Sequence, residues 1–153
     1  MSRREQIKMD PHELASFLDE QRVVVCATIG RDGWPHLMPL WYVVRDGELW
    51  AWTYASSQKV RNLERDPRAT LQVEAGEQYH ELRGVMFKAE AALHRETEQV
   101  AGIGADLAAR YGGADVTEEV LAAMRKQAVK RVGLQFRVTD TATWDHRKLG
   151  GVY

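Results

Sequence analysis

The sequence predicts a mainly β domain: a small closed antiparallel barrel of six strands, with helices covering its ends and one side. Six short runs of strand-like composition follow one another along the chain, separated by turn signals at near-regular spacing. Two of the turns carry the Asp-Gly pair typical of tight hairpins, at residues 32–33 and 46–47. With 153 residues the chain has the length of one domain, so residues 1–153 are expected to share one core. Closure would remove the exposed edges that so many strands create.

The composition excludes several classes of protein. Hydrophobic residues make up 44% of the chain and charged residues 28%, as in a globular domain and unlike a disordered chain. The net charge of −1 provides no overall positive field to hold nucleic acid. The longest apolar run, residues 37–44, is too short to span a bilayer, and the charged N-terminus does not resemble a secretory signal. We therefore expect a soluble cytoplasmic protein with no membrane or nucleic-acid partner.

The cysteine and histidine content argues against a metal centre. Cys26 is the only cysteine, so no disulfide and no multi-cysteine metal site can form within the chain. Cys26 lies in the most apolar run, where we expect a buried, unreactive thiol. The five histidines show no HxH or HxxxH spacing, and the common nucleotide-binding and Ser-hydrolase motifs are absent. No metal site is expected.

The first half of the chain reads as a helix, a three-stranded meander and a second helix. Asp10, Pro11 and Glu13 form a capping-box-like start for a helix that runs to about Gln21. Three strands joined by short turns follow, at Arg22–Gly30, Trp34–Arg45 and Glu48–Tyr54. In the third strand alternate aromatic residues share one face: Trp50, Trp52 and Tyr54. A short helix is then expected at Ser56–Arg65, ended by Asp66-Pro67.

The second half contains the remaining strands and two helices. Strands are expected at Ala69–Val73, at Tyr79–His94 and at Arg131–Thr139, because apolar residues alternate there. Between the last two strands, one helix carries an apolar stripe from Val100 to Tyr111, and a second helix, capped by Thr117, runs to about Ala128. The tail, residues 143–153, shows no regular pattern.

Three segments contain residue combinations suited to binding. In residues 37–42, Pro39 lacks a ladder donor and is flanked by large apolar residues, so free backbone groups could face a planar ligand. The plainer interpretation is an edge strand in which the proline is tolerated and has no role in binding. In residues 54–62, serine hydroxyls at a helix start and Lys59 in its first turn form a reasonable phosphate cradle. A capped surface helix with solvated Lys59 and Arg61 is the alternative.

The third segment is the tail. Trp144, Asp145, His146, Arg147 and Lys148 stand in a row, which provides a ring to stack on a ligand and cations to meet anions. The alternative is a basic tail that only docks on the protein surface.

The residues of the first hairpin and of the following helix resemble a known family. Residues 28–43, TIGRDGWPHLMPLWYV, are similar to the first hairpin of the pyridoxamine 5′-phosphate oxidase-like proteins. Within that superfamily they most resemble the small flavin/deazaflavin oxidoreductases that use coenzyme F-420. The run from Lys59 to Pro67 matches the K-x-x-N-L-x-x-D-P pattern typical of the family. The similarity extends from about Leu14 to Leu93 and includes the last strand and its tail.

The resemblance implies a split β-barrel with a Greek-key element, assembled as a homodimer with two cofactor sites at the subunit interface. The strand Met38, Pro39, Leu40, Trp41 would lie along the flavin or deazaflavin ring. The segment from Thr53 to Asn62 would hold the phosphate, through Lys59 with Ser56, Ser57 and Asn62 nearby. From the partner subunit, Trp144 and His146 would cover the ring. Relatives that bind deazaflavin often carry a second basic residue where this chain has Ser57, and Arg61 could supply that charge.

The resemblance also implies an activity. An oxidoreductase of this kind would use bound F-420 to transfer a hydride to a small, planar, largely hydrophobic acceptor, and a proton would come from solvent, Tyr42 or His146. Two alternatives stay open: an FMN-dependent oxidoreductase of the same superfamily, and a flavin- or haem-binding protein without turnover. The sequence identifies no catalytic residue, because positioning of the two reactants would do most of the work.

Overall fold

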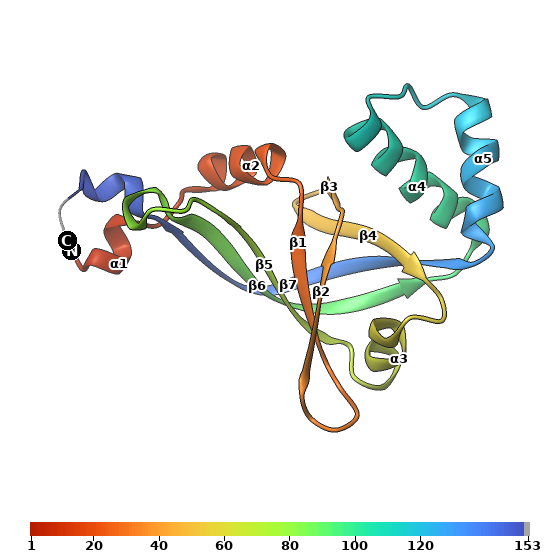
Figure 1. Ribbon diagram of the computed structural model, residues 1–153, viewed down its shortest axis with the longest axis horizontal. Helices are drawn as coiled ribbons and strands as arrows, with labels where there is room; N and C mark the ends of the chain where they lie inside the picture. Colours follow the sequence, from red (N-terminus) through yellow and green to blue (C-terminus); the bar gives the residue numbers. More distant parts are fainter. Residues whose placement is uncertain (152–153) are drawn as a thin grey trace.

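The computed structural model describes residues 1–151 and shows a mainly β protein with flanking helices (Figure 1). The strands are β1 (Val24–Ile29), β2 (Pro35–Leu40), β3 (Val43–Arg45), β4 (Glu48–Tyr54), β5 (Arg68–Ala75), β6 (Arg83–His94) and β7 (Arg131–Asp145). The α-helices are α1 (Arg3–Gln6), α2 (Pro11–Glu20), α3 (Gln58–Arg65), α4 (Thr97–Gly112) and α5 (Glu118–Ala128), and the 3-10 helices are η1 (Tyr79–Glu81) and η2 (His146–Leu149).

All seven strands form one antiparallel sheet in the order β2-β1-β5-β6-β7-β4-β3. The two ends of this order, β2 and β3, are consecutive in the chain, so the sheet curls until its ends are joined by residues 41–42 alone. Within residues 1–151 no ladder connects β2 to β3, and the sheet is therefore not closed. The predictions of six strands and of a closed barrel without edges are wrong.

The seventh strand exists because the predicted strand Trp34–Arg45 is interrupted at Trp41 and Tyr42. Before the interruption the chain pairs with β1, and after it the chain pairs with β4. At the interruption the Tyr42 N–H donates to the hydroxyl of Tyr111 in α4 (2.9 Å). The fully buried Tyr42 side chain donates its O–H to the Leu18 carbonyl at the end of α2 (2.6 Å). Two helices thus hold the chain as it crosses from one end of the sheet to the other.

We expect Tyr111→Phe to destabilise the protein by about 1–3 kcal/mol, because it leaves the partly buried N–H of Tyr42 without an acceptor. The same hydroxyl lies 2.8 Å from the Arg22 carbonyl. The change is measured as a shift in the urea unfolding midpoint. Tyr54→Phe, at an exposed tyrosine, is the matched control and should shift stability by less than about 0.5 kcal/mol. Equal stabilities of the two variants would contradict the role given to Tyr111.

The expected helices at residues 10–21, 56–65, 100–111 and 117–128 are confirmed. Asp10 and Glu13 form a reciprocal capping box at α2, and Thr117 caps α5. The one-turn helix α1 was not predicted, because four residues are too few to show an apolar periodicity. Within the described residues no helix is long and apolar enough to span a membrane.

The C-terminal strands differ from the prediction in their limits. β6 begins at Arg83, because residues 79–81 form η1. β7 does not end at Thr139 but continues to Asp145, so the first three residues of the predicted irregular tail are strand, and η2 follows them. The twelve residues of β6 explain this extension, since they pair with β7 from His94↔Gly133 to Arg83↔Asp145. Residues 152–153 of the predicted tail lie outside the described part of the chain.

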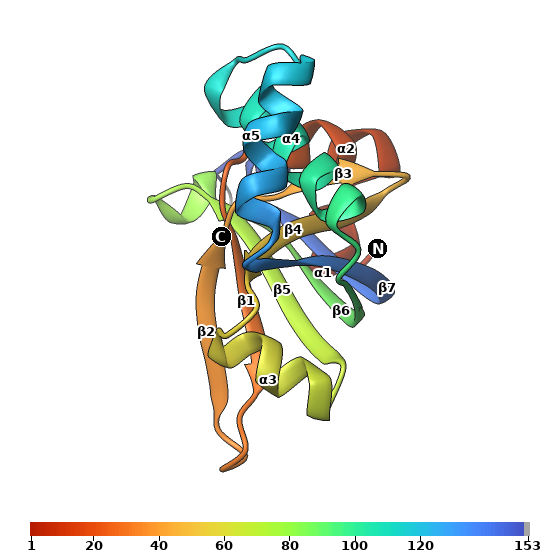
Figure 2. The same ribbon diagram turned by 90° about the vertical axis from the view of Figure 1, so that its right-hand side faces the viewer.

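The main core lies on the concave side of the sheet, with α2 and α3 packed against it. Its largest fully buried members come from α2, the β2–β3 junction, α3 and five strands: Phe17, Tyr42, Phe136, Leu49, Leu71, Leu134, Val24, Val60, Val73 and Val85. A second cluster joins α4 to the opposite face of β3 and β4, through Val43, Ile103 and Leu107 with Trp50 and Trp52. Figures 1 and 2 both place α4 and α5 at one end of the molecule, away from the turn of the β1–β2 hairpin and from α3.

Candidate functional site

One face of the β1–β2 hairpin lies against α3 (Figure 2). Cross-strand neighbours in an antiparallel pair point to the same face. His36 lies opposite Thr28, and Met38 lies opposite Cys26. Thr28 accepts a hydrogen bond from the Asn62 amide of α3 (3.0 Å). His36 and Met38 therefore lie on the face of the hairpin that Asn62 of α3 contacts at Thr28.

Lys59 is a buried cation at this site. Its side chain is 8% exposed, and its ammonium donates to the hydroxyl of Thr53 at the end of β4 (3.1 Å). Among the described residues no carboxylate forms an ion pair with it. Burial lowers the pKa of Lys59 below its ordinary value, because the charged form loses hydration. A buried ammonium without a counter-ion is a suitable partner for an anion from solution.

The N-terminus of α3 offers further donors. Ser57 stands at the N-cap, but its side chain makes no capping hydrogen bond. Its buried Oγ finds no partner among the residues described. The first N–H groups of any helix also lack acceptors within the helix, and they favour an anion. The first turn of α3 thus carries the Ser57 hydroxyl, the free N–H groups and, two residues after Ser57, Lys59. We call this turn the cradle.

A cavity of about 410 Å³ opens between the hairpin turn and the first turns of α3. Gln58 and Asn62 line it from α3, and residues 30–36 line it from the hairpin, including His36. The buried Nδ1 of His36 has no hydrogen-bond partner in residues 1–151. Sequence reasoning did not include His36 in the site. The alternation of His36, Met38 and Leu40 on β2 was the signal that could have found it.

Comparison with known proteins identifies the fold. The model of the pyridoxamine 5′-phosphate oxidase family matches residues 10–145. The chain belongs to this family. A structure of the conserved hypothetical protein Rv2991 from Mycobacterium tuberculosis is 41% identical, with a TM-score of 0.91 over 100% of this chain and 95% of that one. No curated protein matches the chain.

More distant members of the pyridoxamine 5′-phosphate oxidase fold share the architecture. A putative 5-nitroimidazole antibiotic resistance protein from Bacteroides thetaiotaomicron has a TM-score of 0.75 at 10% identity, over 90% of this chain and 84% of that one. An F420 reductase has a TM-score of 0.64 at 18% identity, over 83% of this chain and 94% of that one. At these identities the likeness shows the fold alone.

The predicted ring-contact strand is divided between two faces in this family member. Met38 and Leu40 point to the same side as Cys26 and Val24, where Leu40 packs against the main core. Pro39 belongs to the opposite face and is exposed on β2, an edge of the sheet. Trp41 follows β2 and stacks on Tyr111 of α4, with ring centroids 4.3 Å apart. A planar ligand along this strand would therefore meet either the Met38 side or the Trp41 side.

Three other predicted residues stand apart from the cradle. Ser56 precedes the N-cap and is exposed. Arg61 is exposed on α3, because two residues from Lys59 a helix presents the opposite side. The Tyr42 hydroxyl faces the end of α2, and burial raises its pKa to about 12. Tyr42 is therefore not available as a proton donor to a ligand, which corrects that expectation.

Trp144 and His146 lie far from Lys59 within one chain. Arg131, at the start of β7, pairs with Tyr54 just before α3, whereas Trp144 lies near the other end of this fifteen-residue strand. At the usual rise of about 3.3 Å per residue, the two ends are about 40 Å apart. Trp144 packs over Gly84 of β6, and the His146 Nδ1 lies 2.9 Å from the Tyr79 carbonyl. Only a second copy of the chain could bring this tail to the cradle.

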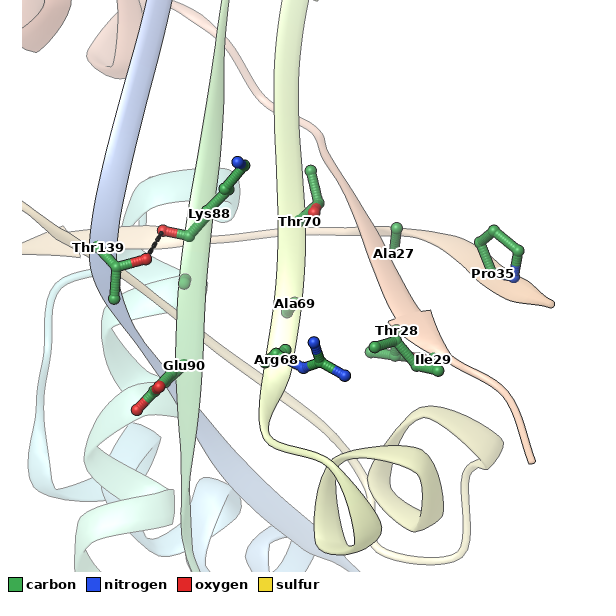
Figure 3. Close-up of a pocket in the computed structure, with 11 residues that line it drawn as sticks. Ala27, Thr28, Ile29, Pro35, Arg68, Ala69, Thr70, Lys88, Glu90 and Thr139 are labelled. Atoms are coloured by element: carbon green, nitrogen blue, oxygen red, sulfur yellow. Dashed lines mark hydrogen bonds between the residues drawn. The ribbon is translucent and has the colours of Figure 1, made fainter. Parts of the chain in front are cut away.

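The convex face of the sheet has a separate hollow of about 420 Å³ (Figure 3). Figure 3 shows Arg68 and Thr70 of β5 beside Lys88 and Glu90 of β6, with the Thr139 hydroxyl donating to the Lys88 carbonyl (3.2 Å). Its two cations differ from Lys59 because both Arg68 and Lys88 are exposed to solvent, and Arg68 already pairs with Asp66 (2.7 Å). The hollow therefore does not replace the α3 cradle as the candidate anion site.

Cys26 is the buried thiol that the sequence predicts, at 1% exposure. Burial raises the pKa of the thiol to about 12, although the nearby Lys59 charge opposes the shift. Since only the thiolate reacts, we expect a disulfide reagent to leave the native protein unlabelled at mildly alkaline pH. One thiol per chain should react once guanidinium chloride unfolds the protein. Rapid labelling of the native protein would show that the core opens around Cys26.

Proposed function

We propose that this protein is an oxidoreductase that binds the deazaflavin coenzyme F-420, with the phosphate of the cofactor held at the start of α3. The buried ammonium of Lys59, which has no carboxylate partner among the described residues, carries this proposal. The hydroxyl of Ser57, two residues earlier in the chain and without a partner among the described residues, supports the same assignment, because phosphate oxygens are acceptors only. Membership of the pyridoxamine 5′-phosphate oxidase family and the fold shared with an F420 reductase support a cofactor of the flavin type.

The residues around the cradle divide the tasks of binding and orientation. Lys59, Ser57 and the first N–H groups of α3 would hold the phosphate. His36, which lines the 410 Å³ cavity together with Gln58 and Asn62, would be a further donor or acceptor. Thr53 and Asn62 keep their positions through buried hydrogen bonds to Lys59 and Thr28. The edge strand β2 would run along the ring.

When bound, F-420 supplies a hydride donor with chemistry close to that of nicotinamide. The contribution of the chain is to fix the acceptor at hydride distance and to exclude water. Because the Tyr42 hydroxyl faces the interior, the proton that completes a reduction would come from solvent or from His146 of a second copy. The acceptor would be small, planar and largely apolar.

We further propose a homodimer in which each cofactor site lies at the subunit interface. The position of Trp144 and His146, about 40 Å along β7 from the cradle, supports this assembly, since each tail could serve only the other copy's site. Sedimentation should give a species of twice the chain mass. A monomer that binds F-420 with full affinity would remove Trp144 and His146 from the site.

The proposed cofactor is tested by parallel fluorescence titrations of the purified protein with F-420 and with FMN. Saturable binding of F-420 at a lower concentration than FMN supports the proposal. Preferential binding of FMN would assign the protein to the flavin-dependent branch and direct the next assays to oxygen or nicotinamide. If neither F-420 nor FMN binds, the protein has the fold of the family but not the proposed function.

A further inference from the structure

The open sheet has two free edges, β2 and β3, because no ladder joins them within residues 1–151. A free edge presents unpaired N–H and C=O groups, and a strand of another molecule can pair with them. Burial does not protect β2, since four of its six residues are exposed. The strand also contains no Lys, Arg, Asp or Glu, and its Leu37 and Met38 are exposed apolar side chains. These features are typical of a strand that pairs with another copy.

The pairing register shows which backbone groups of β2 face the free edge. At the hairpin turn the Gly30 N–H donates to the Trp34 carbonyl (2.9 Å), so residues 30 and 34 form a hydrogen-bonded pair. Along an antiparallel ladder, hydrogen-bonded and non-hydrogen-bonded pairs alternate. Pro35, Leu37 and Pro39 of β2 accordingly lie in non-hydrogen-bonded pairs with β1. The backbone groups of these three residues therefore point away from β1, to the free edge.

Two of the three edge-facing residues are prolines. Pro35 and Pro39 have no N–H, so the edge of β2 has one donor, at Leu37, beside three carbonyls. A further antiparallel strand would need both a donor and an acceptor at each of these positions. A strand paired here would therefore lose hydrogen bonds at two of its three positions.

The β3 edge is protected in a different way. β3 has only three residues, and the two-residue turn at 46–47 places the residues that flank it in a hydrogen-bonded pair. By the same alternation, Val44 points its backbone groups to the free edge, and the next residue to do so is Tyr42. Tyr42 donates its N–H to the Tyr111 hydroxyl (2.9 Å), which also lies 3.0 Å from the Tyr42 carbonyl oxygen. On this edge Val44 alone is left to pair, so the longer β2 is the edge that needs protection.

We propose that Pro35 and Pro39 make the free edge of β2 a surface that excludes a further strand, so that copies of the chain do not join into a continuous sheet. The positions of the two prolines carry this proposal, because a proline at residue 36 or 38 would remove a hydrogen bond to β1 instead. The edge is left free for a ligand, which under the proposed function is the cofactor ring. The exclusion of strands does not rest on that function.

The test compares the wild type with Pro35→Thr/Pro39→Thr, which gives the edge two more N–H donors and introduces a residue that favours strands. Pro11→Ala is the matched control, because Pro11 is exposed at the start of α2 and its replacement changes no strand edge. Sedimentation over a range of protein concentrations measures the size of the assembly. Residue-resolved amide hydrogen exchange measures the protection of the Leu37 N–H.

In the wild type the Leu37 amide should exchange rapidly, whereas the amides of His36 and Met38, which face β1, should be protected. The double variant should form species larger than the wild type, increasingly so at higher concentration. Its Leu37 amide should then exchange at least about tenfold more slowly than in the wild type. Pro11→Ala should match the wild type in both measurements.

Unchanged size and unchanged exchange in the double variant would overturn the proposal, and so would association of Pro11→Ala. A protected Leu37 amide in the wild type would also overturn it, because the edge would then already be covered. If the double variant does not fold, Pro39→Thr alone takes its place in both measurements. Neither measurement uses a cofactor, so a failure of F-420 to bind leaves this result unaffected.

Discussion

Replacing Lys59 with methionine is expected to weaken F-420 binding about ten- to a hundredfold, while making the cofactor-free protein more stable. Methionine keeps most of the side-chain volume but removes a charge-assisted hydrogen bond to phosphate, which is typically worth about 1.5–3 kcal/mol. The gain in stability arises because the ammonium is buried without a carboxylate partner among the described residues. The dissociation constant is measured by fluorescence titration and the stability by urea unfolding.

The stability difference should depend on pH with a definite sign. The folded-state pKa of Lys59 is lowered from its ordinary value of 10.5, so folding is disfavoured while the group is charged. This penalty is complete below the folded-state pKa and disappears as pH rises towards 10.5. The advantage of Lys59→Met over the wild type should therefore shrink at alkaline pH. Lys126→Met, at an exposed lysine of α5, removes the same charge. It should change neither the dissociation constant of F-420 nor the stability of the protein.

Either half of this result can fail separately. An unchanged dissociation constant for F-420 in Lys59→Met would remove Lys59 from the phosphate site. A less stable cofactor-free variant would show that the ammonium makes favourable contacts within the folded chain, and the buried charge would then not indicate an absent anion.

Gly84→Ala is expected to destabilise the protein by about 1–3 kcal/mol or more, which makes it the largest effect on the fold. A Cβ at this position would collide with the Trp144 ring and would lie 2.8 Å from the carbonyl oxygen of Val73 in β5. Movement of the Trp144 side chain relieves only the first contact, because the second is with backbone. Gly102→Ala is the control: its Cβ would meet nothing within 4 Å, and alanine favours the helix by up to about 1 kcal/mol.

Gly84→Ala also tests whether Trp144 contributes to the cofactor site of a second copy. If Trp144 of one copy completes the site of the other, displacing its ring should lower the affinity for F-420 as well as the stability. Thermal unfolding and the cofactor titration on the same preparation report the two effects. If the Gly84→Ala protein were as stable as Gly102→Ala, β6 could move away from Trp144 and from the Val73 carbonyl without loss of stability. That result would contradict the close packing at Gly84.

Local signals account for the parts of the fold and site that the sequence predicts. The capping pattern of Asp10 and Glu13 fixes α2, and Asp-Gly pairs mark both hairpins. In the site, Ser57 and Lys59 at a strand-to-helix junction predict the phosphate cradle, because the serine, the helix start and the lysine are neighbours in sequence. Such features depend on residues within one or two turns of each other.

The features that the sequence does not reveal depend on distant contacts. The interruption at Trp41 and Tyr42 requires a hydroxyl from Tyr111, about seventy residues away. The extension of β7 beyond Thr139 requires a pairing partner along the whole length of β6. The alternation on β2 places His36 on the face of Met38 and Leu40, but only the structure shows that its Nδ1 is buried beside α3 without a partner among the described residues.

The most direct test of the central claim is a crystal structure of the protein with F-420 bound. We predict a phosphate oxygen within about 3.2 Å of the Lys59 ammonium, at the N-terminus of α3 and beside the Ser57 hydroxyl. A phosphate bound instead at the hollow beside Arg68 and Lys88, with Lys59 still without an anion, would contradict it.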